Sequence, residues 1–180
     1  DSLTKEFKTL KGRIVRDGGG VMPDSVIKEE ASYNISGYLY IKNLYFKYAN
    51  RYVLEHPTIA SANEFRLTDK EYSAFCKFVV ESGFTYRLES EKYLQDLKEM
   101  VKTEGYDQKT DSLFTQLTNL LQPNVKEDLT LFREDVQEML EMEIIKRYYY
   151  QKGAIAYSLR SDEWLKIAIN IIQKNADKIQ

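Results

Sequence analysis

Residues 68–83 read TDKEYSAFCKFVVESG, and this stretch decides the fold class. Thr68, followed three residues later by Glu71, is typical of a capping box that satisfies backbone N–H groups at the start of a helix. Apolar residues then recur every three or four positions, which places Tyr72, Phe75, Cys76, Val79 and Val80 on one helical face. Gly83 follows as a stop signal. The stretch therefore predicts a helix over 68–82 with one buried face.

The same spacing continues on both sides of this helix. It predicts five more helices, over residues 33–55, 90–104, 113–121 and 124–150 and from Ser161 onward. Proline or glycine punctuates their ends, at Pro57, Gly105, Pro123 and Gly153. Because no strands alternate with these helices, the pattern predicts an all-α fold, a multi-helix bundle of about six helices.

Each predicted helix carries an apolar stripe that we expect to face the core. In the longest helix the stripe is Leu129, Phe132, Val136, Leu140, Ile144 and Tyr148. In the other helices downstream of Gly83 it comprises Leu94, Leu97, Val101, Leu113, Phe114, Leu117, Leu120, Leu121, Trp164, Leu165, Ala168, Ile171 and Ile172.

Residues 1–28 follow a different pattern. Glu6 to Leu10 alternates polar and apolar residues, Lys11-Gly12 is typical of a turn, and Arg13 to Arg16 resumes a β-rich run. We expect a short β-hairpin here, which alone is only marginally stable. The predicted domains are therefore residues 1–28, a hairpin left over from a larger sheet, and residues 29–180, a helical domain.

Composition excludes several classes of function. The 180 residues hold 26 basic and 28 acidic side chains, one cysteine and one histidine. A single Cys76 and a single His56 exclude an internal disulfide, a four-cysteine zinc site and His-rich metal centres, so we expect no metal and no cofactor. The predicted helical domain has more acidic than basic residues, which disfavours nucleic acid as a partner. No apolar run is long enough for a transmembrane segment.

The N-terminal segment also carries a specific pattern. Phe7-Lys8-Thr9 precedes Gly12-Arg13-Ile14-Val15, and a turn of Gly18-Gly19-Gly20 leads to Val21-Met22-Pro23-Asp24. In order and spacing, this pattern resembles the end of the catalytic core in C-terminal processing (tail-specific) serine peptidases. The helical part is similar to the extension of Bacteroides-like members, through Tyr48-Ala49-Asn50-Arg51-Tyr52 and an Ile-x-x-Arg-Tyr-Tyr segment that runs from Ile144 or Ile145 to Tyr149.

The resemblance implies that the chain is the C-terminal region of a peptidase. The family's nucleophile is a serine and its base a lysine, both upstream of this hairpin, and no lysine here lies between two glycines. We therefore expect no catalytic residues in this segment and a structural role for the motif residues Gly12, Arg13, Gly18, Gly19, Gly20, Pro23 and Asp24. The resemblance also implies a periplasmic or otherwise extracytoplasmic location. The implied partners are the upstream core of the same chain and polypeptide substrates or an adaptor protein.

Two alternatives remain open. One is a free-standing helical protein-interaction module unrelated to peptidases. The other is a self-sufficient hydrolase that uses Ser2 with Lys5 or Cys76 with His56; Ser25 and Lys28 repeat the Ser-x-x-Lys spacing. The structural interpretation of these residues is simpler, because Cys76 lies on an apolar helical face and His56 precedes a proline at a helix end.

Two further clusters allow both a binding and a structural interpretation. The acidic run Glu134, Asp135, Glu138, Glu141 and Glu143 could hold a hard cation, but its spacing favours a solvated helix face, with Glu143 paired to Arg147. Tyrosine is unusually frequent, at 14 residues, and Tyr148, Tyr149 and Tyr150 are consecutive. Consecutive helical residues point in different directions, so we expect one or two of these rings in the core and the remainder exposed.

Overall fold

The computed structural model describes residues 5–10, 12, 14–17, 26 and 34–179, and the chain divides into two compact units, residues 1–31 and 32–180. In the first unit, β1 (Glu6–Lys8) and β2 (Ile14–Arg16) pair antiparallel, with Phe7 opposite Val15. Gly12 closes the turn at φ 81°, and its N–H donates to the Thr9 carbonyl over 2.8 Å. The predicted hairpin is confirmed, and both of its strands are exposed along their whole length.

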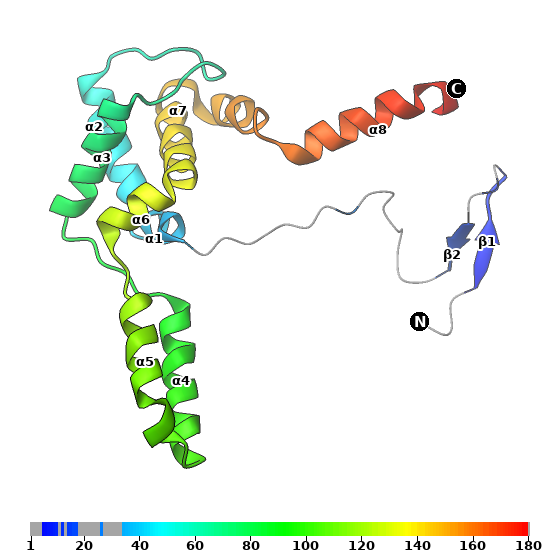
Figure 1. Ribbon diagram of the computed structural model, residues 1–180. Coiled ribbons are helices and arrows are strands. Elements are labelled where there is room, and N and C mark those ends of the chain that lie inside the picture. The colour runs from blue at the N-terminus through cyan, green and yellow to red at the C-terminus, as the bar shows by residue number, and fades with distance from the viewer. Residues whose placement is uncertain (1–4, 11, 13, 18–25, 27–33, 180) are drawn as a thin grey trace. The chain divides into compact units, whose positions relative to one another are not determined.

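Eight helices lie in the described part of residues 32–180 (Figure 1). They are α1 (Ile35–Ile41), α2 (Leu44–Glu55), α3 (Asp69–Glu81), α4 (Glu89–Thr103), α5 (Asp107–Leu120), α6 (Val125–Leu131), α7 (Arg133–Ser158) and α8 (Glu163–Ile179). The predicted all-α class is confirmed. The helix count exceeds the prediction because two predicted helices are each broken in two.

The core lies between α1, α2, α3, α6 and α7, with α2 on α7 as its largest packing. The face predicted for α3 is largely confirmed: Tyr72, Phe75 and Val79 are buried. Phe75 stacks on Tyr45 at 5.6 Å between ring centroids and meets the edge of Tyr48 at 5.1 Å. These rings supply much of the apolar area that stabilises the domain.

The helix predicted over 33–55 is interrupted at Asn43. This residue adopts a left-handed conformation with φ 58°, and its N–H donates to the Tyr40 carbonyl. Asparagine tolerates this conformation better than most residues, so α1 ends and α2 starts in a new direction. Apolar spacing continues across the break, with Leu39 and Leu44 both buried, which is why the spacing did not reveal it.

The bounds predicted for the helix over 124–150 are also wrong. Phe132 separates α6 from α7, and α7 runs through Gly153 to Ser158. Gly153 does not end the helix; a Cβ at this position would lie 2.2 Å from the Cβ of Tyr149, so only glycine fits the close packing here. The interruption within α7 is at Tyr150 instead, where φ is 54° and ψ is −156°.

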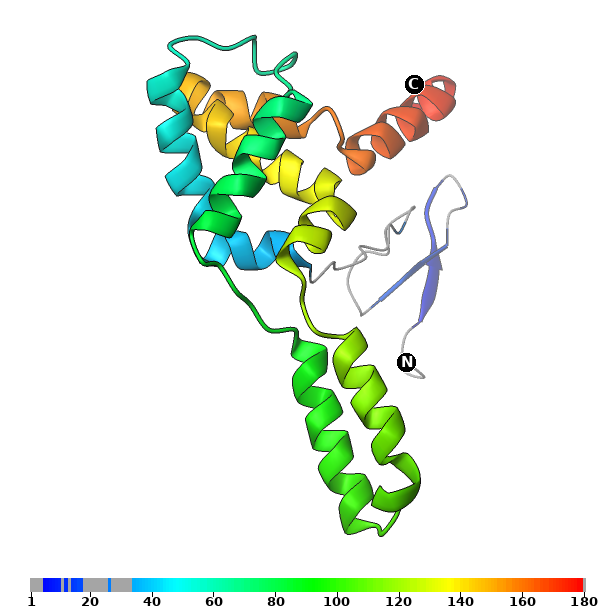
Figure 2. The ribbon, with the colours of Figure 1, turned by 60° about the vertical axis from the view of Figure 1, so that its left-hand side comes forward.

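Helices α4 and α5 form an antiparallel hairpin, which we call the arm (residues 89–120), visible from two sides in Figures 1 and 2. Leu94 and Phe114 are buried between the two helices, and Lys98 pairs with Asp111 over 3.0 Å. Helix α5 begins at Asp107, earlier than the predicted 113. Several residues predicted to face the core are instead exposed in the arm, namely Leu97, Leu113, Leu117 and Leu120.

Helix α8 begins at Glu163 rather than at the predicted Ser161. Asp162 caps this end of the helix, because its carboxylate accepts the Leu165 N–H over 2.9 Å. The apolar face predicted for α8 is present, but Trp164, Leu165 and Ile172 are exposed. Among the described residues, α8 does not pack extensively against any other helix.

Candidate functional site

Residues 56–67, the connecting segment, join α2 to α3 without a regular helix, and α7 holds them in place. The Tyr148 hydroxyl donates to the His56 carbonyl, and the Tyr149 hydroxyl donates to the carbonyls of Ile59 and Ala60. A segment without helical hydrogen bonds needs such partners for its backbone groups. Tyr148 is half-buried, whereas Tyr149 and Tyr150 are exposed, so the predicted split among the three tyrosines is confirmed.

The C-terminal end of the connecting segment is held by a buried carboxylate. Glu141 is 1% exposed. It accepts the Leu67 N–H at 2.9 Å, the Gln137 amide at 2.8 Å and the Tyr157 hydroxyl at 2.7 Å. The solvated face predicted for the acidic run is therefore wrong at Glu141, because this residue lies on the face of α7 that receives the connecting segment.

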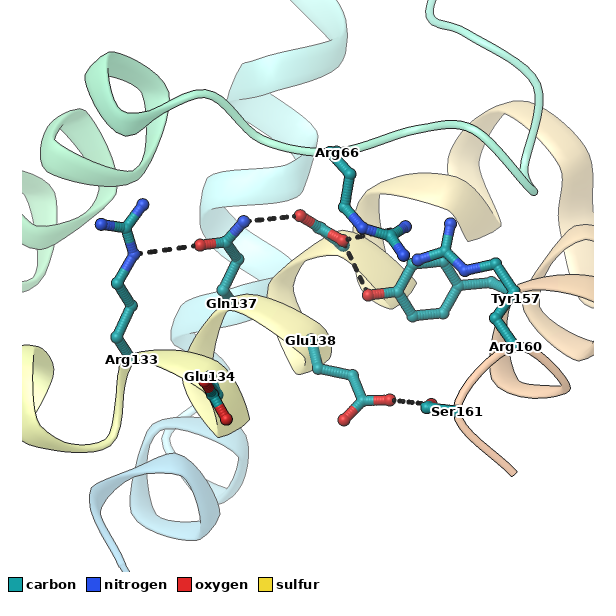
Figure 3. A pocket seen from close by; sticks show the side chains of 9 residues that line it. Arg66, Arg133, Glu134, Gln137, Glu138, Tyr157, Arg160 and Ser161 are labelled. Atoms are coloured by element: carbon teal, nitrogen blue, oxygen red, sulfur yellow. Dashed lines mark hydrogen bonds and ion pairs between the residues drawn. The ribbon is translucent and has the colours of Figure 1, made fainter. Parts of the chain in front are cut away.

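A pocket of about 420 Å³ opens beside Glu141 (Figure 3). It is lined by three arginines, three glutamates and three other polar residues: Arg66, Arg133, Glu134, Gln137, Glu138, Glu141, Tyr157, Arg160 and Ser161. Arg133 donates to the Gln137 side chain, as Figure 3 shows, and Gln137 and Tyr157 both donate to the Glu141 carboxylate. The pocket thus places opposite charges side by side.

Tyr157 lies close to two guanidinium groups of this pocket. Arg160 lies 4.1 Å above its ring and Arg66 lies 5.6 Å from the ring centroid, both at cation–π distance. Arg160 also donates to the Asn63 carbonyl over 2.8 Å, which ties the end of α7 to the connecting segment. Burial and the hydrogen bond to Glu141 raise the pKa of Tyr157. The phenol is therefore a hydrogen-bond donor at neutral pH and does not act as a base.

The pocket's remaining hydroxyl is also engaged. Ser161 donates to the Glu138 carboxylate over 2.8 Å. Arg133 pairs with Asp69 and lies 4.8 Å from the Tyr72 ring. Arg66 lies 3.8 Å from the Glu141 carboxylate, and Arg160 and Glu141 bind backbone groups of the connecting segment, so these contacts stabilise the fold.

Cys76 and His56 have separate partners. His56 Nδ1 lies 2.9 Å from the Tyr52 carbonyl and its ring stacks on Tyr52 at 3.9 Å, which confirms the interpretation of His56 as a helix-end residue. Cys76 is half-buried on α3 against the core, and burial raises the pKa of its thiol. A raised thiol pKa opposes formation of the reactive thiolate.

Most other residues singled out from the sequence lie outside the described residues. These are Ser2, Arg13, Gly18, Gly19, Gly20, Pro23, Asp24, Ser25 and Lys28. Gly12 lies in the β1–β2 turn, and the Lys5 backbone N–H donates to the Asp17 carboxylate at the other end of the hairpin.

The rest of the acidic run is distributed over structural contacts. Asp135 accepts a hydrogen bond from Asn34, and Glu143 pairs with Lys146 at 3.2 Å and with Arg147, as predicted for the latter. Within the described ranges, no group of three His, Cys, Asp or Glu residues could hold a metal ion. The described helices also include none that is long and apolar enough to cross a membrane.

The fold and the pocket define an all-α domain that follows a β-hairpin and whose buried charges fasten a connecting segment to its longest helix. A family model for the C-terminal helical domain of a probable PDZ-protease matches residues 35–172, from α1 into α8. The chain belongs to this family. No curated protein and no solved structure matches the chain significantly.

Proposed function

We propose that this chain is the non-catalytic C-terminal region of an extracytoplasmic C-terminal processing peptidase that uses a Ser/Lys pair. The family match over residues 35–172 carries the proposal, because it assigns the helical domain to a protease. The pattern over residues 7–24, directly before the helical domain, adds the resemblance to the end of a serine peptidase core. In this proposal, the Ser/Lys pair lies in the core and the helical domain carries no part of the chemistry.

The β1–β2 hairpin supports a larger sheet as its partner. Phe7 and Val15 oppose each other across the two strands and are 52% and 41% exposed, and Ile14 is 55% exposed. A two-stranded hairpin with exposed apolar residues has little stability of its own. The upstream core of the same chain is the partner that would extend this sheet, and the helical domain would then be anchored to the core through the hairpin.

Hydrolysis of an unfolded protein such as reduced casein tests the proposal. The 180-residue chain should show no activity, and the parent protein should be active. Substitution of the parent's candidate serine by alanine, and of its lysine by alanine, should each abolish hydrolysis, whereas Ser161→Ala in the parent should not. Hydrolysis by the 180-residue chain, or parent activity that survives loss of the serine, would contradict the proposal.

A free-standing helical interaction module remains the second candidate, favoured by the exposed apolar residues of the arm and α8. The coding sequence upstream of Asp1 separates the two. A serine and a lysine flanked by glycines support the peptidase region, and a start codon or signal peptide directly before Asp1 supports the module.

A further inference from the structure

The arm presents two exposed apolar stripes. On α4, Tyr93, Leu97 and Met100 are 69%, 51% and 60% exposed. On α5, Leu113, Leu117 and Leu120 are 62%, 43% and 82% exposed. Both stripes have the same spacing, four residues and then three, which keeps each stripe on one side of its helix.

The two stripes lie on the same face of the arm. At 100° per residue, each stripe is rotated by the same angle from the buried residue of its helix, Leu94 in α4 and Phe114 in α5. Two antiparallel helices are related by a two-fold axis perpendicular to the plane of the hairpin. Stripes that are rotated by the same angle about their helix axes therefore lie on the same face of the hairpin. The Lys98–Asp111 pair lies on the opposite side, which is polar. The arm therefore has one apolar face of six side chains.

Helix α8 carries a complementary surface. Its exposed apolar residues include Trp164 at 50%, Ile169 at 44% and Ile172 at 59%. At 100° per residue, the apolar residues from Trp164 to Ile172 cover an arc of about 200°, and Lys166 and Gln173 lie outside it. One neighbouring helix cannot cover so wide an arc, whereas a two-helix face can.

The charges of the two surfaces also differ in sign. The arm helices have a small excess of acidic residues, with Glu89 and Asp96 beside the apolar stripe of α4. The described side chains of α8 have an excess of basic residues, Lys166 and Lys174 against Glu163. Opposite charge at the edges of an apolar contact favours its formation and its register.

We propose that α8 of one copy of this chain packs on the apolar face of the arm of a second copy, and that the exchange is reciprocal. Each copy has one arm and one α8, so a two-fold dimer forms two identical contacts and leaves neither surface open. A patch of six large side chains exposes on the order of several hundred Å², more than isolated apolar residues on a monomer surface. Two such contacts together reach the range of about 1,200–2,000 Å² found in stable interfaces.

Sedimentation equilibrium of the 180-residue chain tests the proposal. The unmodified chain should be a dimer, and Leu117→Glu on the arm or Ile172→Glu on α8 should each weaken association by at least about tenfold. Thr115→Glu and Gln173→Glu, on the polar sides of the same helices, are the matched controls and should leave the dimer intact. Circular dichroism should show the same helix content in all five proteins.

Mixing the two weakened variants separates this arrangement from its rivals. Leu117→Glu keeps an intact α8 and Ile172→Glu keeps an intact arm, so the mixture should form a heterodimer through one intact contact. If Ile172→Glu alone remains dimeric, the arms pair with each other; if Leu117→Glu alone remains dimeric, the α8 helices do. Either result overturns the proposal, as does a monomeric unmodified chain at high concentration.

A photo-crosslinking residue at position 117 gives a second readout should a charged variant lose its fold. With isotopically distinct copies mixed, the crosslink should join position 117 of one copy to residues 163–174 of the other. A crosslink within one copy would contradict the proposal. These results do not depend on proteolysis, so the dimer and the proposed function fail independently.

Discussion

Glu141 joins three parts of the chain through one buried carboxylate. Its donors come from the connecting segment at Leu67, from its own helix at Gln137, and from Tyr157 beyond the irregular residue of α7. Hydrogen bonds to a charged and buried group contribute more than those between neutral groups. Removal of any donor leaves part of the charge unsatisfied.

We expect Tyr157→Phe to lower the free energy of unfolding by about 1–3 kcal/mol, because the ring remains and only the donor to Glu141 is lost. Urea unfolding at neutral pH measures this change. Tyr149→Phe is the control: its hydroxyl binds exposed carbonyls of the connecting segment, and we expect a loss below about 1 kcal/mol. Equal losses of unfolding free energy would contradict this expectation, because the hydrogen bond to buried Glu141 would then contribute no more than those of Tyr149.

Tyr150 has a backbone conformation that residues other than glycine rarely adopt. Its φ of 54° with ψ of −156° lies in a region populated mainly by glycine, at a cost of order 1–3 kcal/mol for other residues. The side chain is 77% exposed and contributes little packing.

Tyr150→Gly should therefore raise the free energy of unfolding by about 1 kcal/mol, the relief of strain being partly offset by the greater backbone entropy of glycine. Tyr150→Ala removes the same ring but retains a Cβ, and it should give no gain. The midpoint of thermal unfolding distinguishes them, and coincident midpoints would mean that the conformation carries no strain.

The spacing of apolar residues could not predict the role of Glu141. A carboxylate within a run of acidic residues is ordinarily solvated, and only the position of the connecting segment, far away in sequence, makes this one buried. His56 and the Glu143–Arg147 pair, in contrast, were predictable, because their partners lie four residues away on the same helix.

At the scale of elements, the contact of α7 with α2 gives the stability a dependence on pH. Glu143 is paired with Arg147, which also donates to Asn50 on α2 over 3.1 Å. Burial alone would raise the pKa of Glu143, but its hydrogen bonds with Arg147 and Lys146 outweigh it, and the pKa is lowered.

A carboxyl group whose pKa is lower in the folded state stabilises the protein above its unfolded-state pKa, and this stabilisation is lost as pH falls through the folded-state pKa. We therefore expect the free energy of unfolding to fall from about pH 5 toward pH 3. In Glu143→Gln the fall should be shallower, as measured by urea unfolding at a series of pH values. If the unfolding free energies of the two proteins fall in parallel with pH, Glu143 does not contribute to the pH dependence.

The existence of the helices was more predictable than their limits and their neighbours. The capping box of Thr68 and Glu71 is present in α3, since it depends on residues three apart. The breaks at Asn43 and Phe132 were missed because apolar spacing continues across them. Four leucines of the arm were correctly placed on helices but wrongly assigned to the core, because periodicity defines an apolar face without defining what covers it; they are Leu97, Leu113, Leu117 and Leu120.

At the scale of the whole molecule, the predicted division after residue 28 remains a prediction. Limited proteolysis with a protease of broad specificity tests it: the helical domain should persist as a product that begins between residues 29 and 34. A first cut between α3 and α4, at residues 82–88, would instead place the boundary within the helical part. Mass spectrometry of the early products distinguishes these outcomes.

The class of parent protein was predictable from a short pattern, whereas the pocket was not. The pattern over residues 7–24 depends on order and spacing in one segment, and the family match to a protease domain agrees with it. The pocket joins residues from three separated regions, around Arg66, Arg133 and Arg160. Such a combination is set by tertiary packing, which apolar spacing does not describe.

The fastening of the connecting segment by α7 has a consequence for synthesis. The carbonyl of Asn63 and the N–H of Leu67 find their partners only at Arg160 and Glu141. At ribosomal rates of about 5–20 residues per second, these partners emerge several seconds after the segment itself. Until then, α1 and α2 lack the helix that covers them. The nascent chain is therefore most prone to aggregation and to capture by chaperones just before α7 is complete.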